Sequence, residues 1–400
     1  MRPPHVVIVS QNAPLEMDLR PRREAEALAA AGYDVTLVGG CVSWSDVRRA
    51  TSPDVRLELF QHPVEGAGVR GQIREQGQAM ARALLAVRRA SGHAPVSVVH
   101  AGNPPDNLFL APRALRPFQG STPRFVFDQH DAAPVLLAEK FRHTRFFSPL
   151  KAMADAMERR SFAAARLVVF ANEEYRSRAV RNGLLRGDFE VVPNGWALPR
   201  VPADPRRREG VRHLLAYVGA IAEQDNVDHL VDAVAATQAR HPVKVVVAGS
   251  GSALESVKRR AEARGIGRSF DWLGFVPDRD RIAGIVRAAD VCVAPEIDSE
   301  FNRLATFVKI VEYMSAGAPV VAHRLPQTEA LAGDTIAYAP DMTAQGLADA
   351  ICDMLEAPER RRALGAAALG RFDERVRWER NGALRLVAGY ERLFGREDGG

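Results

Sequence analysis

The sequence predicts an α/β protein built from two Rossmann-like domains, each a doubly wound parallel sheet, and three observations lead to this fold class. Short apolar runs rich in β-branched residues alternate with stretches of helical apolar spacing, which is typical of a parallel sheet covered on both faces. The alternation stops over 199–212, a stretch rich in proline and arginine, and then restarts. A chain of 400 residues is also too long for one ordinary core and long enough for two.

The expected elements follow in order along the chain. In the first half we expect strands over 5–10, 35–40, 55–60, 96–100, 124–128 and 166–170, with helices over 18–31, 69–89, 105–116 and much of 134–163. In the second half we expect strands over 214–219, 243–249, 269–274, 291–295 and 319–322, helices between them, and two or three more helices from 343 to about 394. These elements give domains over 1–198 and 213–375, a linker over 199–212, and a C-terminal helix over 376–400, whose return to the first domain is left open.

Composition limits the function. The net charge is +5, with 26% charged and 46% hydrophobic residues, which is ordinary for a soluble globular protein and too weak a bias for a nucleic-acid binder. Two readings of the excess stay open, namely attraction to anionic substrates or membrane lipids, and plain arginine usage. The three cysteines are few, widely separated and without metal-ligand spacing, which fits a reducing compartment. The start lacks a signal-peptide pattern, which predicts a cytoplasmic protein, with peripheral contact at the inner membrane face left open.

Two local patterns indicate ligand chemistry without naming a reaction. Gly249 and Gly251 lie in a strand-to-helix turn, where glycine lets backbone amides approach an anion. The third glycine of a dinucleotide site and the lysine of a P-loop are missing. Lys309 and Glu312 are three residues apart on a helix expected to start at 305 or 306 and to end at 316 or 317, so they share one face and suit a phosphate and a ribose diol. The alternatives are a plain turn and a surface salt bridge.

A set of motifs in a fixed order goes further. They are 217–219 (YVG), 224–230 (QDNVDHL), 247–251 (VAGSG), 273–277 (LGFVP), 289–295 (ADVCVAP), 309–314 (KIVEYM) and 317–322 (GAPVVA), with 100–106 (HAGNPPD), 127–131 (FDQHD) and 192–195 (VPNG) in the first half. With them the chain resembles the retaining glycosyltransferases of family 4, which have the two-domain GT-B fold. The resemblance implies a transferase that needs no metal and no cofactor and that moves a sugar from a UDP- or GDP-type nucleotide sugar to an acceptor hydroxyl. The acceptor class stays open among carbohydrate, lipid-linked and small-molecule acceptors, as in polysaccharide or glycoconjugate biosynthesis.

The resemblance implies roles for residues of the second half, as the donor-binding domain. Glu312 aligns with the second glutamate of the family's Glu-x7-Glu motif and would bind the donor ribose. Thr306 and Phe307 would offer backbone amides to the diphosphate, and Phe275 lies in the loop that reads the base. The other residues expected around the donor are Gly219, Gln224, Asp225, Gly249 and Gly251.

The chain also departs from the family pattern. Leu304 stands where the first motif glutamate is expected, and Ala220 and Asp225 stand where an arginine and a lysine usually stabilise the departing diphosphate. The loop QDNVD and Lys309 are similar to a subgroup of the family that has a Gln-Asp-Gly-Val-Asp loop. The hypothesis is that Lys309, aided by Arg303, supplies the missing positive charge.

In the first half, as the acceptor-binding domain, the resemblance places His130 against the transferred sugar, with Asn103, Asp106 and Asp131 on the acceptor side. The alternative for His130 is an ordinary histidine at a strand end. The aromatic and cationic stretch 141–151 fits either a lipid contact or a solvated face. Two other functions stay open: a nucleotide-sugar epimerase of the same fold, which would release free sugar, and a noncatalytic partner protein.

Overall fold

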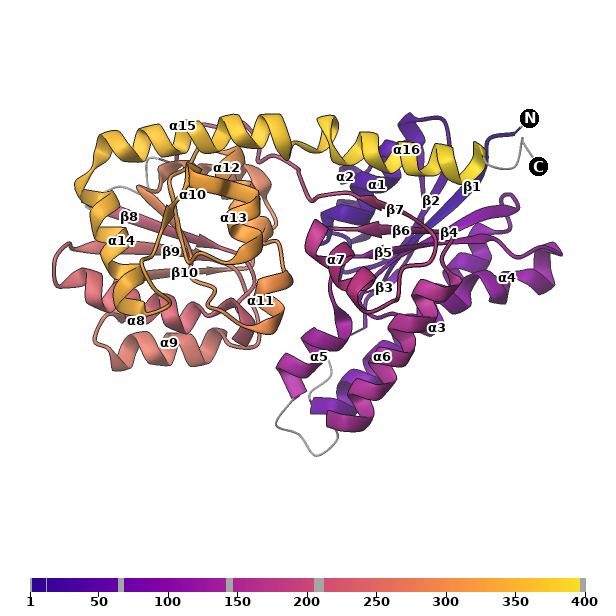
Figure 1. Cartoon of the computed structure of the whole chain (residues 1–400), viewed down its shortest axis with the longest axis horizontal. Coiled ribbons are helices and arrows are strands. Elements are labelled where there is room, and N and C mark those ends of the chain that lie inside the picture. The colour runs from indigo at the N-terminus through magenta and orange to yellow at the C-terminus, as the bar shows by residue number, and fades with distance from the viewer. Residues whose placement is uncertain (1, 12, 64–67, 142–146, 205–211, 396–400) are drawn as a thin grey trace. The chain divides into compact units, whose positions relative to one another are not determined.

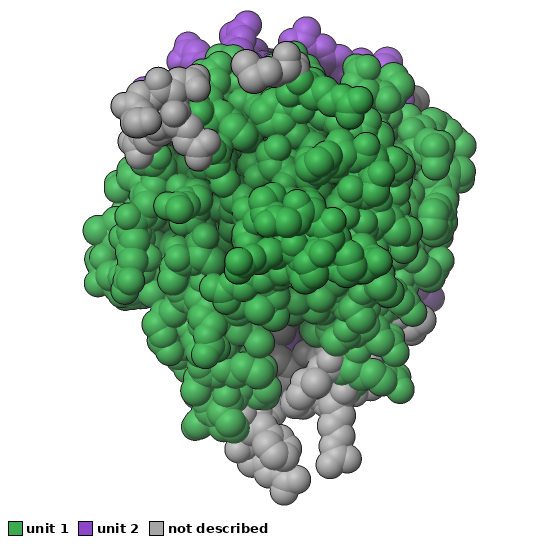
Figure 2. Space-filling view, turned by 90° about the vertical axis from the view of Figure 1, so that its right-hand side faces the viewer, with its two compact units in different colours: residues 1–193, 381–400 green, residues 194–380 purple. Residues whose placement is uncertain are grey.

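The computed structural model describes residues 2–11, 13–63, 68–141, 147–204 and 212–395, and the chain divides into two compact units. Unit 1 contains residues 1–193 and 381–400, and unit 2 contains residues 194–380, as the colours of Figure 2 show. Residues 199–204 of the expected linker belong to unit 2, and 205–211 lie outside the described residues. Residues 142–146 of the aromatic and cationic stretch 141–151 also lie outside them.

Unit 1 is built on a seven-stranded parallel sheet in the order β3-β2-β1-β4-β5-β6-β7 (Figure 1). Its strands are β1 (His5–Ser10), β2 (Asp34–Cys41), β3 (Val55–Gln61), β4 (Val96–Gly102), β5 (Arg124–Gln129), β6 (Leu167–Phe170) and β7 (Asp188–Val191). Its helices are α1 (Leu19–Ala30), α2 (Trp44–Ala50), α3 (Gly68–Ala90), α4 (Ala111–Gln119), α5 (Ala133–Phe141), α6 (Phe147–Ala164), α7 (Glu173–Arg181) and α16 (Gly382–Gly395). The C-terminal helix α16 packs against α1, β6 and β7 within this unit.

Unit 2 is built on a six-stranded parallel sheet in the order β10-β9-β8-β11-β12-β13. Its strands are β8 (His213–Val218), β9 (Val243–Ala248), β10 (Phe270–Gly274), β11 (Val291–Ala294), β12 (Val320–Ala322) and β13 (Ala337–Tyr338). Its helices are α8 (Val227–Gln238), α9 (Leu254–Ala263), α10 (Arg279–Ala288), α11 (Glu300–Leu304), α12 (Val308–Ser315), α13 (Pro326–Ala332), α14 (Ala344–Glu356) and α15 (Pro358–Arg375), with a short 3-10 turn η3 (Glu223–Asp225) after β8.

The central strands form because their residues are apolar on both faces. All six residues of β1 and all four of β11 are buried, as expected where helices cover both sides of a parallel sheet. β1 pairs with both β2 and β4, and β8 pairs with both β9 and β11. The winding of each sheet reverses at these strands, and ligands of such sheets bind outside the carboxyl ends of the strands there.

The fold class is confirmed, and several elements differ from the prediction. β7 and β13 were not expected from the sequence, because both are edge strands of only four and two residues, too short to show an apolar run. The single helix expected over much of 134–163 is two helices, α5 and α6. The helix expected to start at 305 or 306 starts at Val308, because Ser299 caps a separate short helix, α11, which ends at Leu304.

A membrane-crossing helix is not found among the described residues, because none of their helices is both long enough and apolar enough.

Candidate active site

Two loops of unit 2, which follow β8 and β9, touch through their glycines. Gly219 and Gly251 have φ angles of +152° and +156°. A Cβ on Gly249 would lie 1.8 Å from the carbonyl oxygen of Gly219, and a Cβ on Gly251 would lie 2.4 Å from that of Ile221. Only glycine fits these positions. The structure therefore brings the three predicted glycines together beside the carboxyl end of β8.

Lys309 on α12 lies under this pair of loops, with 7% of its surface exposed. A Cβ on Gly219 would lie 2.8 Å from Cε of Lys309. Nζ of Lys309 donates to the Tyr217 hydroxyl at 2.8 Å, contacts Oδ1 of Asp225 at 3.4 Å, and donates to Oε1 of Glu296. We call Lys309, Tyr217, Asp225 and Glu296 the lysine cluster. An ammonium group has three hydrogens, so each has a partner in this cluster.

The charges of the lysine cluster hold each other in place. Burial lowers the pKa of Lys309, but Glu296, Tyr217 and Asp225 outweigh burial and raise that pKa well above its usual value. Burial raises the pKa of Glu296, and Lys309 opposes that shift. Lys309 is therefore a firmly protonated cation in a buried site.

Sequence reasoning did not select Tyr217 as a contact or name Glu296 at all. Glu296 follows β11 after a single proline, and a charged residue directly after a fully buried strand was the signal that could have found it. Its partner Lys309 comes from α12, the second helix after Glu296, and Asp225 comes from the turn η3.

Glu312, one turn along α12 from Lys309, is also buried, with 8% of its surface exposed. Its Oε1 accepts a hydrogen bond of 2.9 Å from Nη1 of Arg279 on α10. Burial raises the pKa of Glu312, and Arg279 opposes that shift. The surface salt bridge considered as the alternative is not formed, because Lys309 and Glu312 bind different partners. Nη2 of Arg279 is buried and lacks a hydrogen-bond partner among the described residues.

The start of α12 has no side-chain cap. Phe307 is its N-cap residue and gives no side-chain hydrogen bond to the first amides of the helix, and of these amides that of Ile310 donates to the carbonyl of Phe307 at 3.1 Å. Thr306 lies between α11 and α12. Leu304, at the place of the missing glutamate, is buried with 8% exposed.

The remaining predicted donor residues lie around this core. The carbonyl of Gln224 accepts a hydrogen bond of 3.0 Å from Asn302 Nδ2. Phe275, in the loop after β10, is 46% exposed. Arg303 forms an exposed ion pair with Asp298, and no contact between Arg303 and Lys309 is found among the described residues.

The predicted residues of unit 1 meet at the carboxyl ends of β4 and β5, tied together by one asparagine. Oδ1 of Asn103 accepts from the backbone amides of His130 at 2.6 Å and Asp131 at 3.2 Å. Nδ2 of Asn103 donates to Oδ1 of Asp106 at 2.7 Å and to the carbonyl of Asp131 at 2.8 Å. Asn103 and Asp106 are buried, whereas the His130 side chain is 15% exposed. Burial raises the pKa of Asp106 to about 7, although the hydrogen bond from Asn103 opposes that shift.

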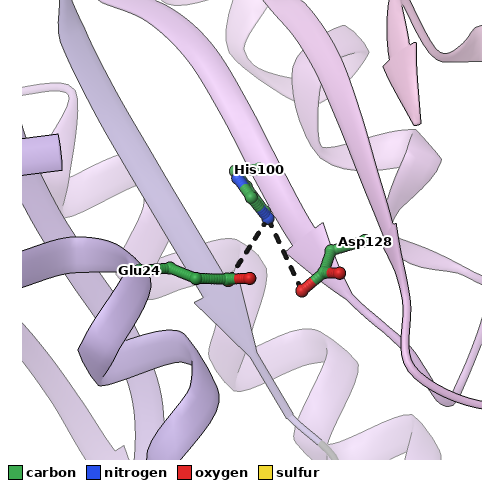
Figure 3. Close-up of side chains that lie close together, drawn as sticks. All are labelled: Glu24, His100 and Asp128. Carbon is green, nitrogen blue, oxygen red and sulfur yellow. Dashed lines mark ion pairs between the residues drawn. The ribbon is translucent and has the colours of Figure 1, made fainter. Parts of the chain in front are cut away.

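A charged cluster lies beneath these residues, and we call Arg20, Glu24, His100 and Asp128 the arginine cluster. Nε and Nη2 of Arg20 donate to the two carboxylate oxygens of Asp128 at 2.9 and 2.7 Å, and Nε lies 3.1 Å from Glu24. Figure 3 shows His100 pointing toward both Glu24 and Asp128, with its Nε2 at 3.4 and 3.7 Å from their oxygens. Nδ1 of His100 lies 2.8 Å from the hydroxyl of Tyr390 on α16.

The arginine cluster also contains a group with metal-ligand chemistry. Ligand atoms of Glu24, His100 and Asp128 lie within 4.8 Å of one another. Both carboxylates, however, contact the guanidinium of Arg20, so a cation already balances their charge. We therefore treat the cluster as a structural network.

The structure has two Rossmann-like units. In each, charged residues gather at the strand where the winding of the sheet reverses, which is the architecture of the two-domain GT-B class. Comparison with known proteins gives the family. Residues 17–195 match the model of the glycosyl transferase 4-like domain, and residues 212–357 match that of the glycosyl transferases group 1. The chain belongs to the family 4 type of glycosyltransferases.

Relatives and solved structures agree with this family. A Mycobacterium tuberculosis protein, GDP-mannose-dependent alpha-(1-6)-phosphatidylinositol dimannoside mannosyltransferase, is 28% identical over 278 residues, 65% of this chain and 68% of that protein. Sucrose-phosphate synthase from Thermosynechococcus elongatus has a TM-score of 0.75 at 18% identity, over 98% of this chain and 100% of that one. HepE of Anabaena in complex with UDP-glucose has a TM-score of 0.70 at 16% identity, over 98% and 99%. The two structures show the fold alone.

Proposed function

We propose that this chain is a retaining glycosyltransferase that needs no metal, and that it moves a sugar from a UDP- or GDP-type nucleotide sugar to an acceptor hydroxyl. The observation that carries the proposal is the lysine cluster at the carboxyl ends of β8 and β11, beside the start of α12, which has no side-chain cap. Family membership supplies the reaction class, and the contacts of this cluster supply a site where a diphosphate can leave.

The donor diphosphate is proposed to lie against the amino end of α12, next to Thr306 and Phe307. The amino end of a helix carries partial positive charge and free N–H donors, which bind phosphate. The glycine loops at Gly219 and Gly249 let the backbone come close without side chains in the way. Glu312 is proposed to accept hydrogen bonds from the ribose hydroxyls, as acidic residues do in other nucleotide folds, while Arg279 keeps its carboxylate oriented.

Lys309 is proposed to stabilise the charge that the diphosphate gains as the anomeric C–O bond breaks. Every hydrogen of the Lys309 ammonium group has a partner within the lysine cluster. Direct contact with phosphate therefore requires that Asp225 or Glu296 be displaced. Asp225 is the partner at the longer distance, 3.4 Å. We therefore expect the phosphate oxygen to replace Asp225 first, with Glu296 keeping Nζ in place.

Retention follows from front-face attack in this proposal. The leaving phosphate oxygen takes the bonding electrons of the anomeric bond and then the proton of the acceptor hydroxyl, so no side-chain base is required. His130 contacts the transferred sugar, and Asp131 contacts the acceptor, while buried Asn103 and Asp106 support them. The acceptor is a carbohydrate, a lipid-linked sugar or a small molecule.

The names of the similar proteins support a nucleotide-sugar donor, and they leave both a UDP-sugar and a GDP-sugar as candidates. The mycobacterial relative is described as GDP-mannose-dependent, and the Anabaena structure holds UDP-glucose. The name of the first also contains phosphatidylinositol dimannoside, a lipid-linked carbohydrate. We include a lipid-linked acceptor in the tests for that reason.

The test is turnover of labelled UDP- and GDP-sugars by the purified chain, with and without a chelator. We expect release of nucleoside diphosphate, unaffected by the chelator, and a product whose anomeric configuration by NMR equals that of the donor. Glu312→Ala should abolish the thermal stabilisation by the nucleotide, and the exposed Glu359→Ala should keep it. Free epimerised sugar would identify an epimerase, binding without turnover a noncatalytic protein, and an inverted product would overturn retention.

A further inference from the structure

His130 is held from three sides in unit 1. Its ring nitrogen Nε2 makes a hydrogen bond with Oδ2 of Asp128, and its backbone amide donates to Oδ1 of Asn103 at 2.6 Å. A Cβ on Gly102, at the end of β4, would lie only 3.0 Å from Cε1 of the His130 ring. Gly102 therefore leaves the room that the ring needs, and the two hydrogen bonds fix the ring and the backbone separately.

Asp128 is suited to act as a fixed acceptor for that ring. Its side chain is 0% exposed, and both of its oxygens accept hydrogen bonds from Arg20, at 2.9 and 2.7 Å. Although burial raises the pKa of Asp128, Arg20, His130 and His100 outweigh burial and hold that pKa well below its usual value. Asp128 is therefore an anion that can only accept hydrogen bonds.

Other titratable groups surround Asp128, but Asp128 is the carboxylate that contacts the His130 ring. Burial and the neighbouring Asp128 raise the pKa of Glu24 well above its usual value, so Asp128 is the more acidic of the two carboxyl groups. Burial lowers the pKa of His100, which is therefore neutral. Asp18 at the start of α1 and Tyr390 on α16 complete the set, and neither contacts the His130 ring among the described residues.

We propose that Asp128, clamped by Arg20, is a positioning residue that fixes the tautomer of the His130 ring, with the proton on Nε2. The second ring nitrogen, Nδ1, then carries a lone pair and accepts a hydrogen bond. A ring nitrogen that faces a pure hydrogen-bond acceptor must carry the proton, and in that tautomer the other ring nitrogen carries the lone pair. The contact partner that we assign to Nδ1 is a hydroxyl of the transferred sugar. That last step rests on the proposed function, whereas the tautomer does not.

The first experiment reads the tautomer directly. Long-range ¹H–¹⁵N NMR spectra of the full chain, labelled at histidine and recorded without ligand above the titration range of the ring, should give His130 the nitrogen shifts of the Nε2–H form. The His130→Gln variant assigns the signals by their loss. The Nδ1–H form, or an equal mixture of tautomers, would overturn the proposal whether or not the chain transfers sugar.

The second experiment asks whether Asp128 acts through His130. Loss of a group that orients a functional histidine costs about 10–100-fold in activity in metal sites, and we expect a kcat/KM loss of that size for Asp128→Asn. In the His130→Ala background the same substitution should cause no further loss. Additive losses would contradict a positioning role. Asp155→Asn, in an exposed pair with Lys151 on α6, is the matched control.

A third variant protects the test against a folding defect at Asp128. Gly102→Ala leaves every charge in place and adds a Cβ 3.0 Å from the His130 ring, so the ring must move by a few tenths of an ångström. We expect kcat/KM to fall while the nucleotide still stabilises the protein against heat. Full activity of a folded Gly102→Ala variant would show that the ring position does not matter and would overturn the proposal.

Discussion

Among the described residues, each unit contains a buried cation that contacts two carboxyl groups, Arg20 in unit 1 and Lys309 in unit 2, but the two cations differ in kind. In unit 1 the cation is an arginine, and in unit 2 it is a lysine. Arg20 spreads its charge over a rigid fork and binds both oxygens of one carboxylate, whereas Lys309 concentrates its charge on a single atom with three donors. The arginine is suited to fixing a geometry, and the lysine to exchanging one partner for another. Both clusters thus combine one cation with two carboxyl groups, but we assign a structural role to the arginine and a role in the reaction to the lysine.

The surroundings of the two cations match this difference. The guanidinium of Arg20 also donates to the carbonyl of Val192 at 2.7 Å, so it ties α1 to β5 and to the chain after β7. Lys309 instead lies against Gly219 in the loop after β8, where a Cβ would lie 2.8 Å from its Cε. The comparison predicts that loss of the arginine damages the fold and that loss of the lysine damages the reaction.

The largest effect is expected on activity, from Lys309→Met. Removing a group that stabilises transition-state charge typically costs on the order of 10²–10³-fold in rate, and we expect kcat to fall by that factor. Glu296 can take up a proton in the variant, because burial already raises its pKa, so the fold should persist. Lys258→Met, in an exposed pair with Glu255, is the control. A folded Lys309→Met enzyme with normal turnover would remove Lys309 from the mechanism.

The next effect is on stability, from Arg20→Met. Removing one partner of a buried ion pair costs about 3–5 kcal/mol, and we expect the free energy of unfolding in urea to fall by that amount. Arg362→Met, in an exposed pair with Glu359, should change it little. An Arg20→Met variant that is as stable as the parent but inactive would reverse the roles that we assign to the two cations.

A smaller effect, dependent on pH, is expected at Asp106, a buried carboxyl outside both clusters. Its Oδ2 lacks a hydrogen-bond partner among the described residues, and burial raises its pKa to about 7 from 3.8. The folded protein therefore keeps this proton over a range where the unfolded chain has lost it. The contribution to stability is complete below pH 3.8 and is lost as the pH rises toward 7.

Asp106→Asn should remove that dependence. The amide cannot ionise, and its oxygen can still accept from Asn103. Urea unfolding at pH 5 and pH 8 should show a smaller difference for the variant than for the parent, with a net gain for the variant at pH 8. Equal pH profiles for the two proteins would mean that Asp106 does not hold a proton in the fold.

The smallest effect is expected from Arg303→Ala. Arg303 was expected to aid Lys309, but it is bound to Asp298 in an exposed pair, where solvent screens its charge. We expect kcat and the affinity for nucleotide diphosphate to stay within a factor of about two, because exposed pairs contribute little. A loss comparable to that of Lys309→Met would show that Arg303 leaves Asp298 to reach the donor.

The fold could be predicted from the sequence because its strong signals are local. Runs such as HVVIVS are buried on both faces and read as strands without further information. Edge strands such as β13, with two residues, carry no such signal. The break between α5 and α6 was missed because residues 142–146 contain no glycine or proline to mark the end of a helix.

The candidate site could be predicted only in part, because the motifs give residues and not their partners. Lys309, Glu312 and the glycines came from the motifs. The ion pair between Arg20 and Asp128 joins residues 108 positions apart, and the bond between Glu312 and Arg279 joins residues 33 apart. Pairs at such separations are set by the topology of the sheet, which a single sequence does not contain.

The most direct test of the account is a crystal structure of the chain with UDP or GDP. We predict that the diphosphate lies within hydrogen-bonding distance of the first amides of α12, that the ribose hydroxyls contact Glu312, and that Nζ of Lys309 has exchanged Asp225 for a phosphate oxygen. A nucleotide bound elsewhere, or a diphosphate that leaves the lysine cluster untouched, would contradict it.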